Sequence, residues 1–265
     1  MSATPIGADQ TALVTGASGG IGLALARQFA AGGYDVVLVA RSAAALETLA
    51  GDLAREFHVT ATPIAHDLGR PDAGRELVRT LDARGLAIDV LVNNAGFGTT
   101  GAFAAGETDV EVGIVDVNIR ALVELTHELW PRFLRNKRGG VLNVASTAAF
   151  QPGPFMSVYC ASKAFVLSFT EALWEEARGT GVHVSCLCPG VTESGFHARA
   201  GTDKLALMHG GMMSAAAVAA LGYQAFQANR RVKIAGLVNT MMARSAALTP
   251  HALVLRIARM LLSPA

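Results

Sequence analysis

The stretch Thr11-Ala12-Leu13-Val14-Thr15-Gly16-Ala17-Ser18-Gly19-Gly20-Ile21-Gly22 decides the fold. A short apolar run leads into a glycine-rich turn, and a helical apolar pattern follows at 21–31. The glycines at 16, 20 and 22 let the backbone turn sharply and approach a pyrophosphate, and the N–H groups that open the next helix are suited to bind it. Their spacing, G-x-x-x-G-x-G, differs from the commoner dinucleotide fingerprint, and a turn without a ligand is the alternative. The strand before and the helix after favour a dinucleotide site.

Strand and helix patterns alternate from Thr11 to Gly190 without a linker or an internal repeat. Near-continuous apolar runs predict strands buried on both faces, at 12–14, 36–40, 59–64, 90–92, 141–144 and 182–187. Helices are predicted at 21–31, 43–57, 72–84, 110–135 and 157–177, and Pro131 is expected to bend or end the fourth. This rhythm predicts an α/β fold, a doubly wound parallel sheet (Rossmann fold), in one domain of 265 residues.

The composition argues against several classes of protein. A net charge of +1 without a basic tract gives no electrostatic footprint for nucleic acid. Cys160, Cys186 and Cys188 form no metal-ligand or disulfide pattern, and the last two alternate in an apolar run, which favours buried strand residues over a redox or zinc site. The polar stretch 1–10 does not resemble a signal peptide, and glycines at 210–211 interrupt the uncharged stretch 205–229. We therefore expect a cytoplasmic protein without a membrane span.

A Tyr-x-x-x-Lys pair, Tyr159 and Lys163, lies in the predicted helix 157–177. Residues four apart share one face of a helix, so the Lys163 ammonium is expected beside the Tyr159 phenol. A phenol has a pKa near about 10, and a neighbouring cation is one of the few means of lowering it for acid–base chemistry near neutrality. Together with the dinucleotide site, the pair predicts an oxidoreductase.

The chain carries several motifs in the order in which the short-chain dehydrogenase/reductase family has them, and it resembles that family over about residues 10–195. The turn 15–22 matches the family's TGxxxGIG, Asp67-Leu68 its adenine-contacting pair, and Asn93-Asn94-Ala95-Gly96 its NNAG motif. The resemblance implies a catalytic tetrad of Asn118, Ser146, Tyr159 and Lys163. The cofactor contacts that it implies are Gly16, Ser18, Gly19, Gly20, Ile21, Gly22, Asp67, Leu68, Asn94, Ala95, Gly96, Tyr159, Lys163, Pro189, Gly190 and Thr192.

The resemblance also implies a mechanism. In reduction, NADPH delivers hydride to a carbonyl carbon while Tyr159 gives its proton to the oxygen, which Ser146 orients. Lys163, with the positive nicotinamide of the oxidised cofactor, would lower the Tyr159 pKa and hold the nicotinamide ribose. Asn118 would position a water that relays protons from Lys163 to solvent. Tyrosine is the acid in reduction and the base in oxidation, so the physiological direction stays open.

Each motif residue also has a structural interpretation. Taken alone, Ser146 is an ordinary strand-end serine, Asn118 a helix residue and Tyr159 a tyrosine at the edge of the core. Asn93 and Asn94 are suited to bond backbone groups across neighbouring strands, which we favour for Asn94. The conjunction of motifs favours catalysis. The alternatives are a non-catalytic NADP(H)-binding regulator and a peripheral membrane or scaffold protein.

The end of the second predicted strand indicates the cofactor. Ala40 stands where the family's NAD enzymes tend to carry an acid that accepts from the ribose 2′-hydroxyl and repels a 2′-phosphate. Arg41 follows, a guanidinium able to bind phosphate with two hydrogen bonds, and Ser42 adds a hydroxyl donor. We predict NADP(H), with a solvated arginine and an NAD-preferring alcohol dehydrogenase as the alternatives.

The substrate is less determined. Apolar residues flank the matched catalytic residues, and others lie in a predicted lid at about 192–213; they are Phe97, Phe150, Pro152, Phe155, Met156, Phe196 and Met208. Such a lining suits an apolar carbonyl compound, and core packing explains each residue equally well.

After Gly195 the resemblance fades. We expect a helix at 214–229 that begins at Ser214, a strand at 232–235 and an extension at 237–265 with arginines at 244, 256 and 259 and a break at Pro250. We expect the extension to form helices packed on the body or on a second subunit, which seal an oligomer or the substrate mouth; a membrane-surface helix is the alternative. Family members commonly associate through helices matching 110–135 and 157–177, so we expect a homodimer or homotetramer.

Overall fold

The computed structural model describes residues 6–196, 200–202 and 212–263. Its centre is a seven-stranded sheet in the order β3-β2-β1-β4-β5-β6-β9, with all neighbours parallel. The strands are β1 (Thr11–Thr15), β2 (Asp35–Ala40), β3 (Ala61–Ala65), β4 (Val90–Asn93), β5 (Gly140–Val144), β6 (His183–Cys188) and β9 (Val232–Ile234). The order reverses between β1 and β4, which opens a crevice at their carboxyl ends. The predicted fold class is confirmed.

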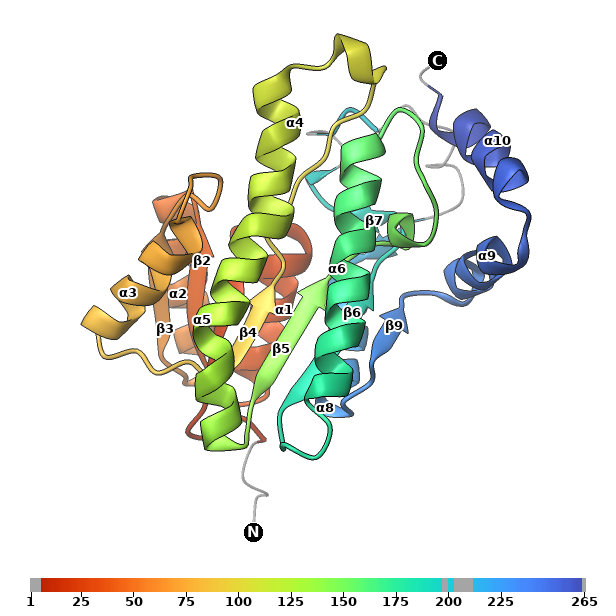
Figure 1. Ribbon diagram of the computed structural model, residues 1–265. Helices are drawn as coiled ribbons and strands as arrows, with labels where there is room; N and C mark the ends of the chain where they lie inside the picture. The colour runs from red at the N-terminus through yellow and green to blue at the C-terminus, as the bar shows by residue number, and fades with distance from the viewer. Residues whose placement is uncertain (1–5, 197–199, 203–211, 264–265) are drawn as a thin grey trace.

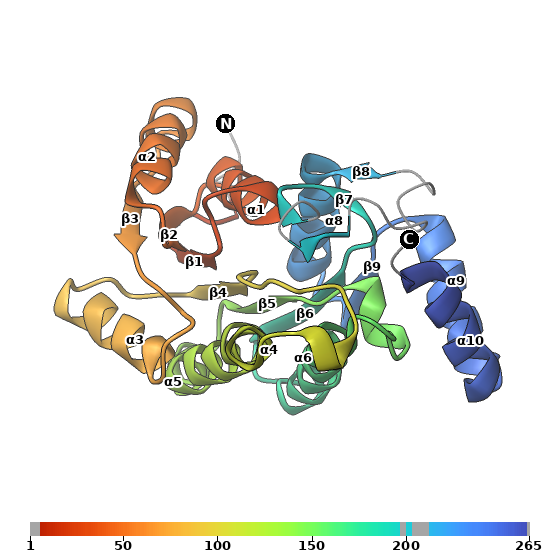
Figure 2. The same ribbon diagram turned by 90° about the horizontal axis from the view of Figure 1, so that it is seen from above.

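Helices cover both faces of the sheet (Figure 2). One face carries α1 (Gly20–Ala31), α2 (Ala43–Phe57) and α8 (Ala215–Gln227), and the other carries α3 (Ala73–Ala83), α5 (Ala121–Asn136) and α6 (Ser157–Glu176). Successive residues of a strand pack on opposite faces of the sheet. Val14 belongs to the hydrophobic cluster that contains Phe29 of α1, and Leu13 belongs to the cluster that contains Leu77 of α3. Because both faces are buried, the strands read as continuous apolar runs.

The single helix predicted at 110–135 is divided in the structure. α4 (Thr108–Val115) passes into a π-helical turn at Asp116–Arg120 and then into α5. Such turns are frequent at functional sites, and this one carries the buried Asn118. Pro131 does not end the helix, since α5 continues to Asn136. Leu129 and Phe133, on either side of the proline, are fully buried in the core.

The C-terminal part adds short strands and two helices. β7 (Thr192–Glu193) and β8 (Met213–Ser214) form a small parallel pair, and Ser214 caps α8 as predicted, with its Oγ accepting the Ala217 N–H at 3.2 Å. α9 (Leu237–Leu248) and α10 (His251–Leu262) lie at one edge of the molecule (Figure 1), separated at Pro250 as predicted. Within the described ranges, no helix is long and apolar enough to cross a membrane. Met208 and part of the predicted lid lie outside those ranges.

Candidate functional site

The glycine-rich turn joins the end of β1 to the start of α1. Gly16 and Gly20 have φ values of +68° and +54°, in the left-handed region that favours glycine. A Cβ on Gly22 would lie 2.2 Å from the Gly16 carbonyl oxygen and 2.4 Å from Asn94 Nδ2, so only glycine lets the helix begin this close to the turn. A Cβ on Gly19, the N-cap, would meet no atom within 4 Å, and Ser18 beside it is exposed. This open backbone cradle at a helix N-terminus fits a pyrophosphate.

Thr15 ties this turn to β4. Its Oγ1 donates to the Val92 carbonyl oxygen at 3.1 Å and accepts the N–H groups of Asn94 and Ala95, both at 3.0 Å. Asn94 Nδ2 donates to the Thr15 carbonyl oxygen at 2.9 Å, which agrees with the structural interpretation of Asn94. Thr15 had no role assigned from the sequence, although a hydroxyl at the last position of a strand before a glycine-rich turn is a visible signal.

The residues predicted to select the cofactor lie at the ends of the adjacent strands β2 and β3. Arg41 is exposed, and no carboxylate within the described part of the chain pairs with it. Ser42 caps α2, and because its Oγ only accepts, from the Ala45 N–H at 3.4 Å, its O–H can still donate. Asp67 is exposed, with Oδ1 accepting the Gly69 N–H at 3.0 Å, and the neighbouring Leu68 is buried. This end of the crevice thus offers a free guanidinium and a hydroxyl.

Three of the predicted catalytic residues meet where β5 ends against α6. Ser146 follows β5, begins a 3-10 turn at Thr147–Phe150, and hydrogen-bonds the Tyr159 side chain. Lys163 lies one turn along α6, with Nζ 5.9 Å from the centroid of the Tyr159 ring and 2.9 Å from the Val144 carbonyl oxygen to which it donates. Tyr159 and Lys163 are only 8% and 6% exposed. The structure therefore brings Ser146, Tyr159 and Lys163 together as the sequence predicts.

Burial is the main cause of the pKa shifts of both Tyr159 and Lys163. Burial raises the pKa of Tyr159 to about 12, while the hydrogen bond with Ser146 acts to lower it. Burial lowers the pKa of Lys163 to about 8, against a raising effect of the Cys186 and Cys188 thiols. Desolvation disfavours the charged form of both residues. A lower Tyr159 pKa in the presence of Lys163 and the oxidised nicotinamide stays a prediction.

Asn118 joins the π-helical turn to the catalytic helix. Its Oδ1 accepts the Phe97 N–H at 3.1 Å, and its Nδ2 donates to the Phe97 carbonyl oxygen at 3.0 Å and to Ser162 Oγ at 2.9 Å. A Cβ on Gly96 would lie 3.0 Å from Asn118 Oδ1 and 3.3 Å from Lys163 Nζ. Asn118, Gly96 and Lys163 thus border one narrow space. The side chain of Asn118 holds the loop after β4 against α6, and its role in a proton relay stays a prediction.

A chain of buried polar side chains lies beneath the site. Asn93 Nδ2 donates to Asn143 Oδ1 at 2.9 Å and to Thr126 Oγ1 at 3.1 Å, and Asn143 Nδ2 donates to Thr170 Oγ1 at 2.9 Å. Asn93 therefore bonds side chains here, whereas backbone partners were expected. The chain links β4, β5, α5 and α6, and buried amides of this kind specify one arrangement because each must find its partners. Asn143, an amide within an apolar strand, is the signal that the sequence offered.

The segment after β6 returns to the glycine-rich turn. Thr192 is buried, and its Oγ1 donates to the Gly190 carbonyl oxygen at 3.0 Å, which shapes the turn after Pro189. A Cβ on Gly190 would lie 2.3 Å from Asn239 Nδ2, so the first turn of α9 packs on this segment. A Cβ on Gly20 would lie 3.0 Å from Ser194 Cβ. Asn239 and Ser194 were not predicted, although Ser194 is a second hydroxyl two residues after Thr192.

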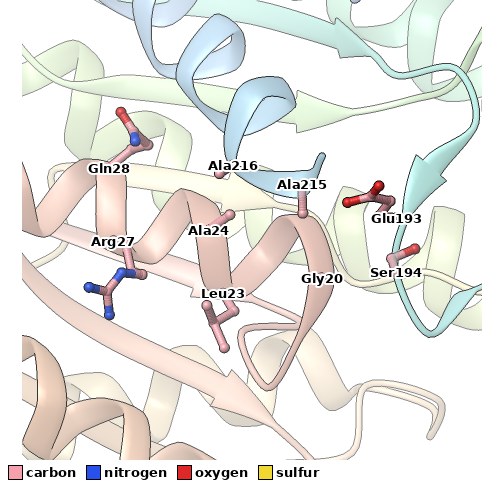
Figure 3. Close-up of a pocket in the computed structure, with 9 residues that line it drawn as sticks. All are labelled: Gly20, Leu23, Ala24, Arg27, Gln28, Glu193, Ser194, Ala215 and Ala216. Atoms are coloured by element: carbon pink, nitrogen blue, oxygen red, sulfur yellow. The ribbon is translucent and has the colours of Figure 1, made fainter. Parts of the chain in front are cut away.

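A cavity of about 390 Å³ opens beside Gly20 (Figure 3). It is lined by residues of α1, of the segment after β6 and of the start of α8: Gly20, Leu23, Ala24, Arg27, Gln28, Glu193, Ser194, Ala215 and Ala216. Ser146, Tyr159 and Lys163 do not line it. The cavity therefore lies beside the glycine-rich turn and not at the catalytic centre.

Apolar side chains surround the Tyr159 ring. Met156, Cys160 and Leu262 are buried with it in one cluster, against which Phe196 packs. The ring centroids of Phe196 and Tyr159 are 5.4 Å apart. A Cβ on the neighbouring Gly153 would lie 3.4 Å from Leu262 Cδ1. The C-terminal helix α10 thus reaches the cluster that contains Tyr159.

Only part of the predicted apolar lining adjoins this tyrosine. Met156 and Phe196 do so, whereas Phe150 packs with the core residues Ala145 and Val166, as the core-packing alternative proposed. Phe97, Pro152 and Phe155 are half-buried in the adjoining loops. Leu262 was not predicted, because nothing in the sequence indicates where a C-terminal helix returns. Cys186 and Cys188 are buried on β6, and no group of metal ligands occurs among the described residues.

Known proteins share this sequence pattern. The family model for short chain dehydrogenase matches residues 10–205. A short chain dehydrogenase of Pseudocercospora fijiensis is 36% identical over 187 residues, which are 70% of this chain. The match spans 60% of the length of that relative.

Solved structures share the fold. A short-chain dehydrogenase from Sphingobium yanoikuyae in complex with NADPH is 32% identical with a TM-score of 0.80, covering 90% of this chain and 93% of that chain. A short chain dehydrogenase/reductase from Burkholderia phymatum in complex with NAD is 25% identical with a TM-score of 0.79, covering 90% and 92%. Since the family model matches well over half of its length, the chain belongs to the short-chain dehydrogenase/reductase family.

Proposed function

We propose that the protein is an NADP(H)-dependent oxidoreductase that transfers hydride between the nicotinamide and a carbonyl or alcohol carbon of an apolar substrate. The observation that carries the proposal is the buried group of Ser146, Tyr159 and Lys163 beside an open glycine-rich turn. A bound nicotinamide nucleotide would supply or accept the hydride. The protein's residues bind, orient and transfer the proton.

The assigned roles follow from the protonation states. A raised pKa keeps the proton on the Tyr159 oxygen at neutral pH, which suits a donor in reduction, and the hydrogen bond from Ser146 orients the reacting groups. Lys163, with its pKa lowered to about 8, exchanges a proton close to neutral pH, as a relay to solvent requires. Its ammonium would also hold the nicotinamide ribose. Asn118 fixes the loop and helix that border it.

The cofactor assignment depends on the end of β2. Arg41 is exposed and unpaired among the described residues, and Ala40 offers no carboxylate for a ribose 2′-hydroxyl. These features support NADP(H) over NAD(H). The alternative, an NAD-preferring enzyme, is kept because one similar structure holds NADPH and another NAD.

The substrate assignment depends on the apolar cluster at Tyr159. Met156, Phe196 and Leu262 place apolar side chains around the proposed proton donor, which favours an apolar carbonyl or alcohol. We also propose a homodimer or homotetramer formed through α4, α5 and α6, because Val112 of α4 and Phe165 of α6 are 48% and 38% exposed. A cytoplasmic location stays a prediction.

The test is a panel of apolar ketones and aldehydes measured with NADPH and with NADH. NADPH should bind more tightly, and Arg41→Ala should remove a contact of about 1.5–3 kcal/mol, which is roughly tenfold or more in affinity. Tyr159→Phe should bind NADPH nearly normally and lose turnover by about 10²- to 10⁴-fold. Equal affinity for both cofactors would refute the preference. NADPH binding without turnover of any compound would favour the non-catalytic regulator.

A further inference from the structure

The two C-terminal helices carry an exposed apolar surface. On α9 it comprises Leu237, Val238, Met241, Met242 and Leu248, and on α10 it comprises Leu253, Ile257 and Met260. Leu255 of α10 is also exposed, on another face of the helix. Together these are more than half of the large apolar side chains that are exposed in the described ranges. Many large apolar side chains exposed on neighbouring elements indicate an interaction site. We call it the C-terminal apolar surface.

Helix α10 has two apolar faces. Val254, Ala258 and Leu262, spaced four residues apart, are buried against the body. Leu253, Ile257 and Met260, at positions i, i+4 and i+7, form a second stripe that is 48%, 42% and 71% exposed. Packing against the body therefore leaves the outer stripe without a partner in the described structure.

The charges carried by the two C-terminal helices are of one sign. Seven lysine and arginine residues follow Asp203 in the sequence, and no aspartate or glutamate follows it. Arg244, Arg256 and Arg259 lie on the two helices, are exposed, and make no ion pair with any described residue. A partner that covers the surface must supply the negative charge itself.

A second copy of the chain does not meet this requirement. A two-fold contact places the same patch on both sides, so Arg256 and Arg259 of the two copies would approach one another. Neither α9 nor α10 contains a carboxylate that would compensate them. An anionic phospholipid surface supplies both an apolar interior for Leu, Ile and Met side chains and phosphate groups for arginine.

We propose that the C-terminal apolar surface binds the surface of an anionic phospholipid membrane. α10 has 12 residues, fewer than the about 20 that cross a bilayer, so it lies in the plane of the interface. In this orientation the substrate side of the site would also face the membrane, an inference that rests on the proposed function. Leu262 of α10 packs beside Tyr159, so docking would bring the substrate side of the site to the interface, where apolar carbonyl compounds concentrate.

The test is flotation of the full-length protein with phosphatidylcholine vesicles, with and without phosphatidylglycerol. Binding should require phosphatidylglycerol and weaken as salt is raised. Each arginine near an anionic surface contributes about fivefold in affinity, so Arg256→Gln/Arg259→Gln should bind roughly 25-fold more weakly. Leu253→Ser/Ile257→Ser should also lose at least about tenfold. Thermal unfolding of each variant checks that it is folded.

The matched control is Arg79→Gln/Arg84→Gln, which removes the same charge from exposed positions on and after α3. α3 and α10 lie at opposite edges of the molecule (Figures 1 and 2), so this control should bind like the wild type. Equal loss in the control, or equal binding to vesicles without phosphatidylglycerol, would overturn the proposal. So would absence of vesicle binding together with a self-association that Leu253→Ser/Ile257→Ser abolishes. Because binding is read without turnover, this outcome is independent of the proposed activity.

Discussion

Lys163→Met should make the protein more stable at neutral pH while removing its activity. Lys163 is 6% exposed, and burial lowers its pKa from 10.5 to about 8. Keeping its ammonium charged inside the fold therefore costs free energy relative to the unfolded chain. Methionine has a similar length and no charge, so it would occupy the same space without this cost.

The size of the effect follows from the pKa difference. A shift from 10.5 to about 8, at about 1.36 kcal/mol per pKa unit, corresponds to about 3 kcal/mol. Methionine also loses the hydrogen bond from Nζ to the Val144 carbonyl oxygen, worth about 1 kcal/mol. The expected net gain is about 2 kcal/mol in the free energy of unfolding, or roughly 4–8 °C in Tm.

The pH dependence tests the cause. The folded pKa of Lys163 lies below its unfolded value, so between about pH 8 and pH 10.5 the unfolded chain binds more protons and wild-type stability from this group rises with pH. The advantage of Lys163→Met should therefore be present at pH 7 and nearly gone at about pH 10. Urea unfolding of both proteins in cofactor-free buffer at the two pH values measures it.

The matched control is Lys233→Met, at a half-buried lysine on β9. Its side chain is less buried than that of Lys163, so the substitution should give no comparable pH-dependent gain. A Lys163→Met variant less stable than the wild type at pH 7, or an advantage that persists unchanged to pH 10, would refute the reasoning.

Three further results are expected. Lys163→Ala should weaken NADPH binding as well as turnover, whereas Tyr159→Phe should affect turnover alone. Fluorescence titration measures the NADPH affinity, and steady-state kinetics measure turnover. Equal NADPH affinity in both variants would contradict the contact between Lys163 and the ribose. Gly22→Ala should destabilise the fold by about 1–3 kcal/mol, because the new Cβ would lie 2.2 Å from the Gly16 carbonyl oxygen, whereas Gly19→Ala meets no atom within 4 Å and should leave Tm nearly unchanged. Leu262→Ala should raise kcat/KM for bulkier ketones relative to small ones by removing apolar volume beside Tyr159, and an unchanged ratio would show that α10 does not border the substrate.

The sequence by itself determined the sheet, the turn and the residues of the proposed catalytic group. The alternation of apolar runs with helical segments predicts a doubly wound sheet because parallel strands are buried on both faces. Gly16, Gly20 and Gly22 predict the cradle because local backbone geometry requires glycine there. Tyr159 and Lys163 could be paired because one helical turn separates them.

Only the tertiary structure decided contacts between segments far apart in the chain. The Asn93–Asn143 hydrogen bond, the packing of Asn239 on Gly190 and the approach of Leu262 to Tyr159 each depend on how distant elements pack. The pKa of Tyr159 is likewise a property that only the tertiary structure decided. The sequence indicated a neighbouring cation, but the degree of burial, which raises the Tyr159 pKa against the hydrogen bond with Ser146, is a property of the assembled fold. Local periodicity carries no information on desolvation, because burial is set by every element that covers a side chain.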